Sequence, residues 1–164
     1  MAKIRDVISN KSLKPSERVS VLNQMIENDL TLFLDEMSQL RPVDSARAME
    51  ALELYTRTNS VAEIEKVHDL VSKGIMQSNN ALVRESCRVI ANIASADLNY
   101  DSIAARLLEL TEHTGTVIRW AAATALVSLA ENHPSLRLQE VFDSIAAREE
   151  KNSIRKIYLR LKKV

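Results

Sequence analysis

The sequence predicts an all-α fold, on three observations. Glycine and proline are scarce, with two Gly and three Pro in 164 residues, which is too few for a loop-rich all-β protein or a disordered tail. Apolar residues make up 46% of the chain and aromatic residues only 4%, so Leu, Ile, Val and Ala must form a core of the kind that packed helices build. These apolar residues recur at helical spacing along the chain and nowhere alternate as strands do. The length fits one domain over residues 1–164.

Short polar segments separate the predicted helices. Pro15, Pro42 and Pro134 stand at or just before helix starts, where the missing N–H group costs little. Ser60 and Glu63 have the spacing of a capping box. In order, we expect helices over residues 3–9, 15–27, 30–40, 45–57, 61–76, 81–95, 99–112, 117–131, 135–148 and 153–162.

Predicted cap residues recur every 36 residues along the chain. Each is of a type whose side chain accepts a hydrogen bond at a helix N-terminus, and two helices fit within each interval. A fixed period of this kind is typical of a helical solenoid. We therefore expect about four helix pairs, over about residues 29–58, 59–96, 97–132 and 133–164, after an N-terminal helical cap at 1–28. The predicted caps are Asp44, Asn80, Thr116 and Asn152.

The second helix of each interval shares a pattern: a β-branched residue, an arginine, any residue, and then small residues leading to leucine. The segment from Val117 to Leu129 shows it most clearly, and it resembles the inner helix of a HEAT repeat, one of the armadillo-like repeat families. The resemblance implies an α-α superhelix in which these arginines stack along the solenoid and bond to polar residues at the turn between paired helices. Only one of the four turn residues is acidic, so the ladder would be hydrogen-bonded more than ionic. Its implied members are Arg84, Arg119 and Arg155, with Asp44, Asn80, Thr116 and Asn152 at the turns.

The resemblance also implies a concave surface made by the second helices, where such proteins bind partners. Trp120 is the only tryptophan, and the arginine alignment places it level with Glu85 and Lys156, which are residues of exposed types. Trp120 is therefore expected to face outward, as contact aromatics do; packing on the neighbouring repeat is an equal alternative. The expected surface contains Glu85, Arg88, Asn92, Trp120, Thr124, Val127, Lys156, Arg160 and Lys163.

Charge is unevenly distributed, although 22 basic and 22 acidic residues give a net charge of zero. Residues 1–18 carry a net charge of +3, residues 148–164 carry +5, and the middle carries −8. The basic C-terminal cluster has two interpretations. The favoured one is a solvated outer face on the last helix; the other is a contact for an acidic protein or a phosphate backbone.

No motif indicates catalysis, a cofactor or a metal. Cys87 is the only cysteine, which excludes an internal disulfide and a cysteine cluster, and we expect it to be a small buried residue. His68, His113 and His133 have no metal-ligand spacing. Gly-rich phosphate loops and hydrolase signatures are absent from the sequence.

The expected function is that of a non-catalytic scaffold or adaptor that binds a protein or peptide on the concave surface. We expect a cytoplasmic monomer or weak oligomer, because no window is apolar enough for a membrane span and no signal peptide is evident. One alternative is a nucleic-acid-binding protein resembling the HEAT-like alkylpurine DNA glycosylases. The neutral charge, the acidic middle and the single tryptophan disfavour it. The other alternative is a protein resembling the HEAT-like phycobilin lyases, which only the repeat supports.

Overall fold

The computed structural model describes residues 3–163 and is all-helical over that range, which confirms the predicted fold class. The side chains are described as far as Leu161. The elements are α1 (Ile4–Ser9), α2 (Pro15–Asn28), α3 (Leu30–Met37), α4 (Pro42–Thr56), α5 (Ile64–Gly74), α6 (Asn80–Ile93), α7 (Asp101–Leu110), α8 (Thr116–Asn132), η1 (Pro134–Leu136), α9 (Gln139–Arg148), α10 (Asn152–Leu159) and η2 (Arg160–Lys163).

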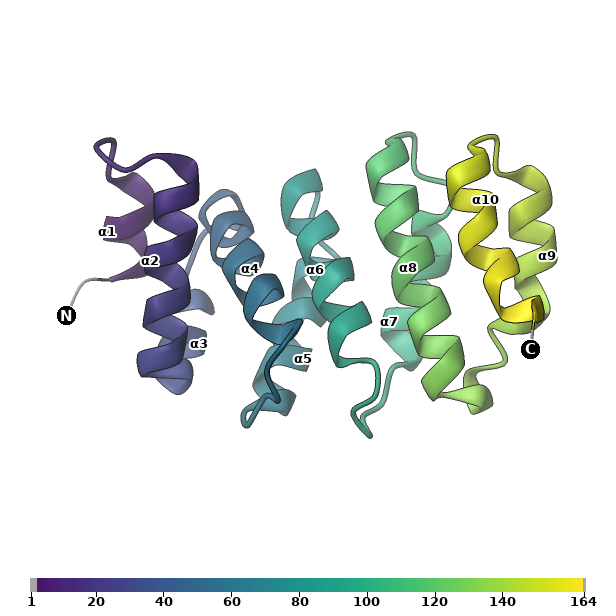
Figure 1. Cartoon of the computed structure of the whole chain (residues 1–164), viewed down its shortest axis with the longest axis horizontal. Helices are drawn as coiled ribbons and strands as arrows, with labels where there is room; N and C mark the ends of the chain where they lie inside the picture. Colours follow the sequence, from purple (N-terminus) through teal and green to yellow (C-terminus); the bar gives the residue numbers. More distant parts are fainter. Residues whose placement is uncertain (1–2, 164) are drawn as a thin grey trace.

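The helices form two layers along the long axis of the molecule (Figure 1). Helices α2, α4, α6, α8 and α10 stand side by side in one layer, which we call the front layer, and α3, α5, α7 and α9 lie behind it. Each front helix packs on the next one, α4 on α6, α6 on α8 and α8 on α10. All five front helices run in the same direction, with their N-termini at the upper edge in Figure 1. Equivalent positions of successive front helices therefore lie at the same height.

Small buried residues allow the central helices to pack closely. Ala121, Ala122 and Cys87 are fully buried, as the sequence predicts, because a small side chain lets one helix backbone approach another. Gly74 has the same role between α5 and α6, since a Cβ atom added there would overlap the Ser86 hydroxyl. Within the described part of the chain, no side-chain hydrogen bond or ion pair joins the body of α6 to that of α8, so the two helices meet through apolar packing along their length. A directional contact lies just past their C-terminal ends, where His133 Nε2 is 2.7 Å from the Ala94 carbonyl oxygen.

The starts of α6, α8 and α10 follow the predicted 36-residue period, whereas α4 begins 38 residues before α6. The predicted caps are wrong by a residue or more. Asn80, Thr116 and Asn152 are the first residues of α6, α8 and α10, and Asp44 lies within the first turn of α4. A capping side chain must stand just outside the helix, where the backbone is extended. Asn79 occupies that position for α6, and its Oδ1 accepts a hydrogen bond from the Leu82 amide at 3.0 Å.

Two other local predictions differ from the structure. The predicted capping box at Ser60 is wrong, because α5 begins at Ile64 and its flanking residue Glu63 makes no side-chain capping bond. The predicted helix 135–148 is split into η1 and α9, since Arg137 takes a left-handed backbone conformation with φ of 53°. The prolines are confirmed as helix starters at α2, α4 and η1.

Candidate functional site

The structure shifts the predicted alignment of α6 with α8 and α10 by one residue. Helices α6, α8 and α10 begin at residues 80, 116 and 152, so positions 36 residues apart are equivalent. Arg84 is thus level with Trp120 and Lys156, and not with Arg119 as the arginine pattern suggested. The next equivalent positions, Glu85, Ala121 and Ile157, are all buried.

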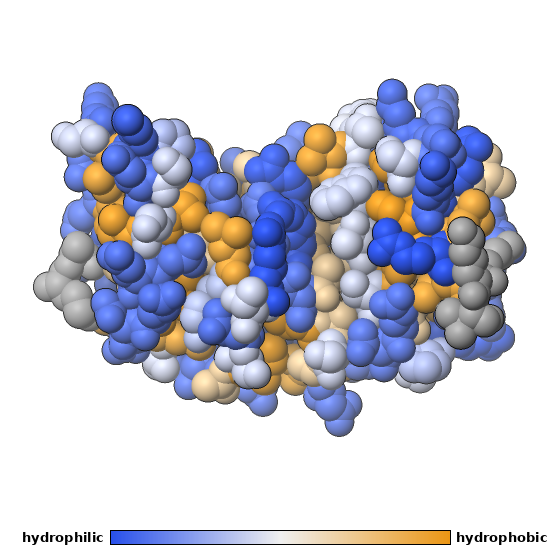
Figure 2. All heavy atoms as spheres, viewed as in Figure 1, coloured by the Kyte–Doolittle hydropathy of each residue, from blue (hydrophilic) through white to orange (hydrophobic). Residues whose placement is uncertain are grey.

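This register defines a row of exposed and half-buried side chains across the front layer, which we call the front-face row. It consists of Arg84, Trp120 and Lys156, followed one turn later by Arg88, Thr124 and Arg160. Trp120 is 41% exposed, which confirms the expected outward orientation. Figure 2 shows strongly hydrophilic atoms over α6 and over α10 on this face, with paler atoms over α8 between them. The row therefore places one large aromatic side chain between two groups of cations.

The cations at the two ends of the row differ in their pairing. Lys156 and Arg160 on the α10 side are exposed and form no ion pair with any described residue. Arg84 and Arg88 on the α6 side are bound to Glu85, whose side chain is only 2% exposed, with Nη2–Oε1 and Nη1–Oε2 distances of 2.7 and 3.0 Å. Positive charge that is free to attract an anion is therefore concentrated at the α10 end.

A buried polar network ties α4 to α6 beneath the row. The Glu53 side chain of α4 is 4% exposed and binds Arg57 at 2.7 Å and Arg88 of α6 at 3.3 Å. Asn92 of α6 donates to the Glu53 carbonyl and to the Thr56 hydroxyl, each at 3.0 Å. The hydrogen bond that Arg57 donates to the Glu53 carboxylate raises the pKa of Arg57. A buried carboxylate requires such partners, since an unpaired buried charge is strongly destabilising.

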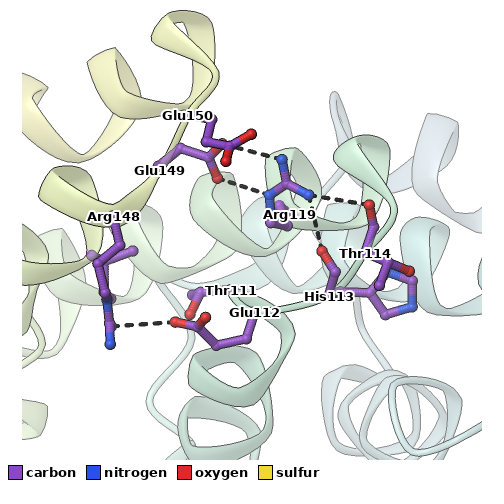
Figure 3. Close-up of a pocket in the computed structure, with 9 residues that line it drawn as sticks. Thr111, Glu112, His113, Thr114, Arg119, Arg148, Glu149 and Glu150 are labelled. Carbon is purple, nitrogen blue, oxygen red and sulfur yellow. Dashed lines mark hydrogen bonds and ion pairs between the residues drawn. The ribbon is translucent and has the colours of Figure 1, made fainter.

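The predicted arginine ladder is present at two of its three positions. Arg119 donates to both Glu149 oxygens, at 2.9 and 3.2 Å, and to the His113 and Thr114 carbonyls, at 3.0 and 3.2 Å (Figure 3). Arg155 donates to the Glu149 carbonyl at 2.8 Å. Arg84 bonds to its neighbour Glu85 instead of a turn, because the one-residue shift places it on the surface.

The ladder is mainly hydrogen-bonded, as expected, because Arg119 and Arg155 both donate to main-chain carbonyls, and the Arg119–Glu149 pair adds an ionic contact. The predicted turn partners Asn80, Thr116 and Asn152 make no side-chain bond to the arginines, and Asp44 pairs with Arg41 at 3.0 Å. Glu149, whose side chain is 4% exposed, takes their place. Its hydrogen bonds from Arg119 hold the pKa of the Glu149 carboxyl below its ordinary value.

A pocket of about 250 Å³ lies beside this ladder. Its walls come from the turn between α7 and α8 and from the end of α9 (Figure 3). The buried groups that face it are already bonded to one another, and Arg148 at its rim pairs with Glu112 at 3.3 Å. We therefore assign this cluster to the joining of the last two helix pairs. The lining residues are Thr111, Glu112, His113, Thr114, Arg119, Ile145, Arg148, Glu149 and Glu150.

The other predicted surface residues divide into two groups. Glu85 and Val127 are buried, at 1% and 4% exposure, so the prediction that they line the surface is wrong. Asn92 is half-buried and holds α4, and Thr124 is half-buried with its hydroxyl bonded to the Trp120 carbonyl at 3.0 Å. The side chain of Lys163 lies outside the described part of the structure.

Two of the histidines have structural partners, and the cysteine is buried. His68 and His133 contact Tyr100 from two sides, with ring centroids at 5.2 and 4.8 Å. The Nε2 atoms of His68 and His133 lie 2.8 and 2.7 Å from the Asn99 and Ala94 carbonyls. Burial raises the pKa of the Cys87 thiol to about 12.

No group of three or more His, Cys, Asp or Glu side chains in the described part of the chain is arranged to hold a metal ion. Among the described helices, none has the length and apolar character needed to span a membrane.

Comparison with known proteins finds no matching family model, no matching curated protein and no matching solved structure. The front-face row is therefore the candidate site on the strength of its own geometry and chemistry.

Proposed function

We propose that this chain is a HEAT-like helical-repeat protein that binds a protein or peptide segment along the front-face row, as a non-catalytic scaffold or adaptor. The observation that supports this proposal most is the exposure of Trp120, a large aromatic side chain at the centre of a row of cations. Tryptophan and arginine are the residues in which binding energy most often concentrates at interfaces. The assignment to a class of function rests on analogy with other helical repeats.

The HEAT-like character has partial support from the arginines. Arg119 and Arg155 bond to main-chain carbonyls at the turns that precede their helices, as the resemblance implies. Two layers of paired helices in which each front helix packs on the next also suit a solenoid. Arg84 departs from the pattern, and the buried Glu149 replaces the expected turn residues.

Nucleic acid is the less favoured ligand. Arg84 and Arg88 are each bound to a buried carboxylate, which lowers the net charge that a phosphate backbone would meet on the α6 side. A nucleic-acid site depends on many unneutralised cations. In the part of the row that the structure describes, only Lys156 and Arg160 are such cations.

Selection from a random peptide display library, performed on the wild-type protein and on Trp120→Ala, tests this function. We expect enriched peptides that bind the wild-type protein and lose about 2 kcal/mol of binding free energy on Trp120→Ala, which is about a 30-fold weaker affinity. Met76→Ala is the control, since Met76 is 55% exposed and lies outside the row. Peptides that bind Trp120→Ala and the wild-type protein equally, or no enrichment at all, would overturn the proposal.

A further inference from the structure

We propose that the front-face row selects an extended acidic peptide in which an apolar side chain is flanked by a carboxylate three residues away on each side. This inference rests on the proposed function and specifies its ligand. The apolar side chain would contact Trp120, and the two carboxylates would face the cations of α6 and α10.

The spacing follows from the register of the front helices. Axes of packed helices are about 8–10 Å apart, and Arg84, Trp120 and Lys156 occupy equivalent positions on three successive front helices. Successive contacts along the row are therefore separated by about the same distance. A polyproline II segment advances about 3.1 Å per residue with three residues per turn. Every third side chain of such a segment points the same way, at intervals of about 9 Å.

The width of the row favours an extended chain over a helix. The cations and the aromatic side chain of the row lie within one turn, because the equivalent positions one turn earlier and one turn later are uncharged: Asn80, Thr116 and Asn152 before it, and Asn92 and Ser128 after it on α6 and α8. The row is thus about one helical turn, or roughly 5 Å, in height. That height suits a single extended backbone, whereas an α-helix with its side chains is about 10–12 Å across. A helical ligand would repeat its contacts every seven residues, which makes the two forms distinguishable.

The charges predict unequal contributions from the two carboxylates. Lys156 and Arg160 have no carboxylate partner among the described residues, whereas Glu85 already occupies Arg84 and Arg88. The peptide carboxylate that faces α10 therefore gains most of the Coulomb attraction. Charge attraction at an exposed site chiefly raises the association rate and weakens as salt increases.

The test measures the fluorescence of Trp120, the only tryptophan of the chain, during titration with synthetic peptides that contain no tryptophan. The parent peptide carries glutamate, two spacers, leucine, two spacers and glutamate. Matched peptides place the glutamates two, four or seven residues from the leucine, replace both by glutamine, or scramble the order. We expect the three-residue spacing to bind at least tenfold more tightly than the others, and this preference to shrink at high salt.

Variants of the protein separate the charge effect from folding. Lys156→Glu combined with Arg160→Glu should weaken the parent peptide at least tenfold and flatten its salt dependence. Lys73→Glu, a single charge reversal on α5 behind the row, should leave binding unchanged. Thermal unfolding of each variant checks that the fold persists; if the double variant is unfolded, Lys156→Gln alone should still weaken binding severalfold.

Several results would overturn the inference. A seven-residue preference would indicate a helical ligand, and tighter binding of a single-stranded oligonucleotide would indicate nucleic acid. Equal binding of the scrambled peptide, or no fluorescence change up to millimolar peptide, would also reject it. If display selection yields Trp120-dependent peptides with another spacing or charge, the proposed function stands and only this inference fails. If selection yields no such peptides, both fail.

Discussion

Gly74 and Ser86 provide a sharp test of how closely α5 approaches α6. The Ser86 hydroxyl is fully buried and has no hydrogen-bond partner. A Cβ atom added at Gly74 would overlap that hydroxyl and would lie 3.2 Å from the Ser86 Cβ atom and 3.6 Å from Leu82 Cδ1. The two positions should therefore be coupled, and a double-mutant cycle measures that coupling.

The magnitudes follow from these contacts. Ser86→Ala removes a buried hydroxyl without a partner and should raise the free energy of unfolding by about 1 kcal/mol. Gly74→Ala alone should lower it by about 1–2 kcal/mol, because overpacking costs about 1–3 kcal/mol and the helix preference for alanine returns up to about 1 kcal/mol. In the Ser86→Ala background the overlap is gone and one tight Cβ–Cβ contact remains. There Gly74→Ala should be near neutral, which gives a coupling of about 1–2 kcal/mol.

Urea unfolding of the wild-type protein, both single variants and the double variant provides the four free energies of the cycle. The slope of each transition must agree among the variants for the comparison to hold. Equal effects of Gly74→Ala in both backgrounds would refute the close approach. Loss of stability on Ser86→Ala would show that the hydroxyl has a partner after all.

Three further predictions concern the ion pair, the packed alanines and the thiol. Hydrogen bonds from Arg119 are the chief cause of the lowered folded pKa of Glu149, so its stabilisation is present above the ordinary carboxyl pKa and disappears as pH falls through the lowered value. Glu149→Gln should cost about 3 kcal/mol at pH 7 and flatten the loss of stability that sets in below about pH 5. Glu150→Gln, at an exposed neighbour, should do neither in urea titrations at each pH. Ala121→Leu should lower the free energy of unfolding by about 1–3 kcal/mol through overpacking. Ala81→Leu, on the exposed side of α6, should change the unfolding midpoint little. A neutral effect of Ala121→Leu would contradict the close packing of α8. Cys87 should resist a thiol reagent in the native state, because burial raises its pKa to about 12, and should react fully in urea; rapid native labelling monitored by absorbance would disprove this.

The helices and their period were predictable from the sequence because both depend on local patterns. Each predicted helix overlaps an observed one, and the small residues of α8 are buried as expected. The pairing of Arg84 with Trp120 was not predicted, because the second helices were aligned on their arginines and not on their buried residues. Arg84 and Arg119 are 35 residues apart, while the buried residues Leu82, Ile118 and Ile154 are 36 apart. Alignment on these three residues would have placed Trp120 beside Arg84 and Lys156.

The buried carboxylates were harder to foresee. Glu85 and Glu149 occur in charged surroundings that are typical of a solvated face, and a sequence does not show which of two adjacent glutamates points inward. Arg88, three residues after Glu85, is a local sign of pairing. The pairing of Glu149 with Arg119 spans 30 residues and depends on how α8 and α10 pack, so no local pattern indicates it.

The interface between α6 and α8 differs from the α4–α6 and α8–α10 interfaces in how well it resists sliding of one helix past the other. Directional bonds cross from α4 to α6 through Glu53, and the Arg119–Glu149 pair fastens the end of α9 and the turn into α10 onto α8. Such bonds fix both the distance and the angle between the helices that they join. Apolar contacts between small side chains fix the distance but oppose sliding only weakly. At the seam between α6 and α8, the directional contacts of the described residues lie at the helix ends and behind the front layer: His133 Nε2 is 2.7 Å from the Ala94 carbonyl oxygen, and Arg106 of α7 donates to the Ile75 carbonyl at 3.1 Å. The N-terminal halves of α6 and α8, which carry Arg84 and Trp120, meet through apolar packing, and they are the part of this seam that opposes sliding least. Bending at that seam changes the separation of Arg84 from Trp120 and leaves that of Trp120 from Lys156 nearly constant.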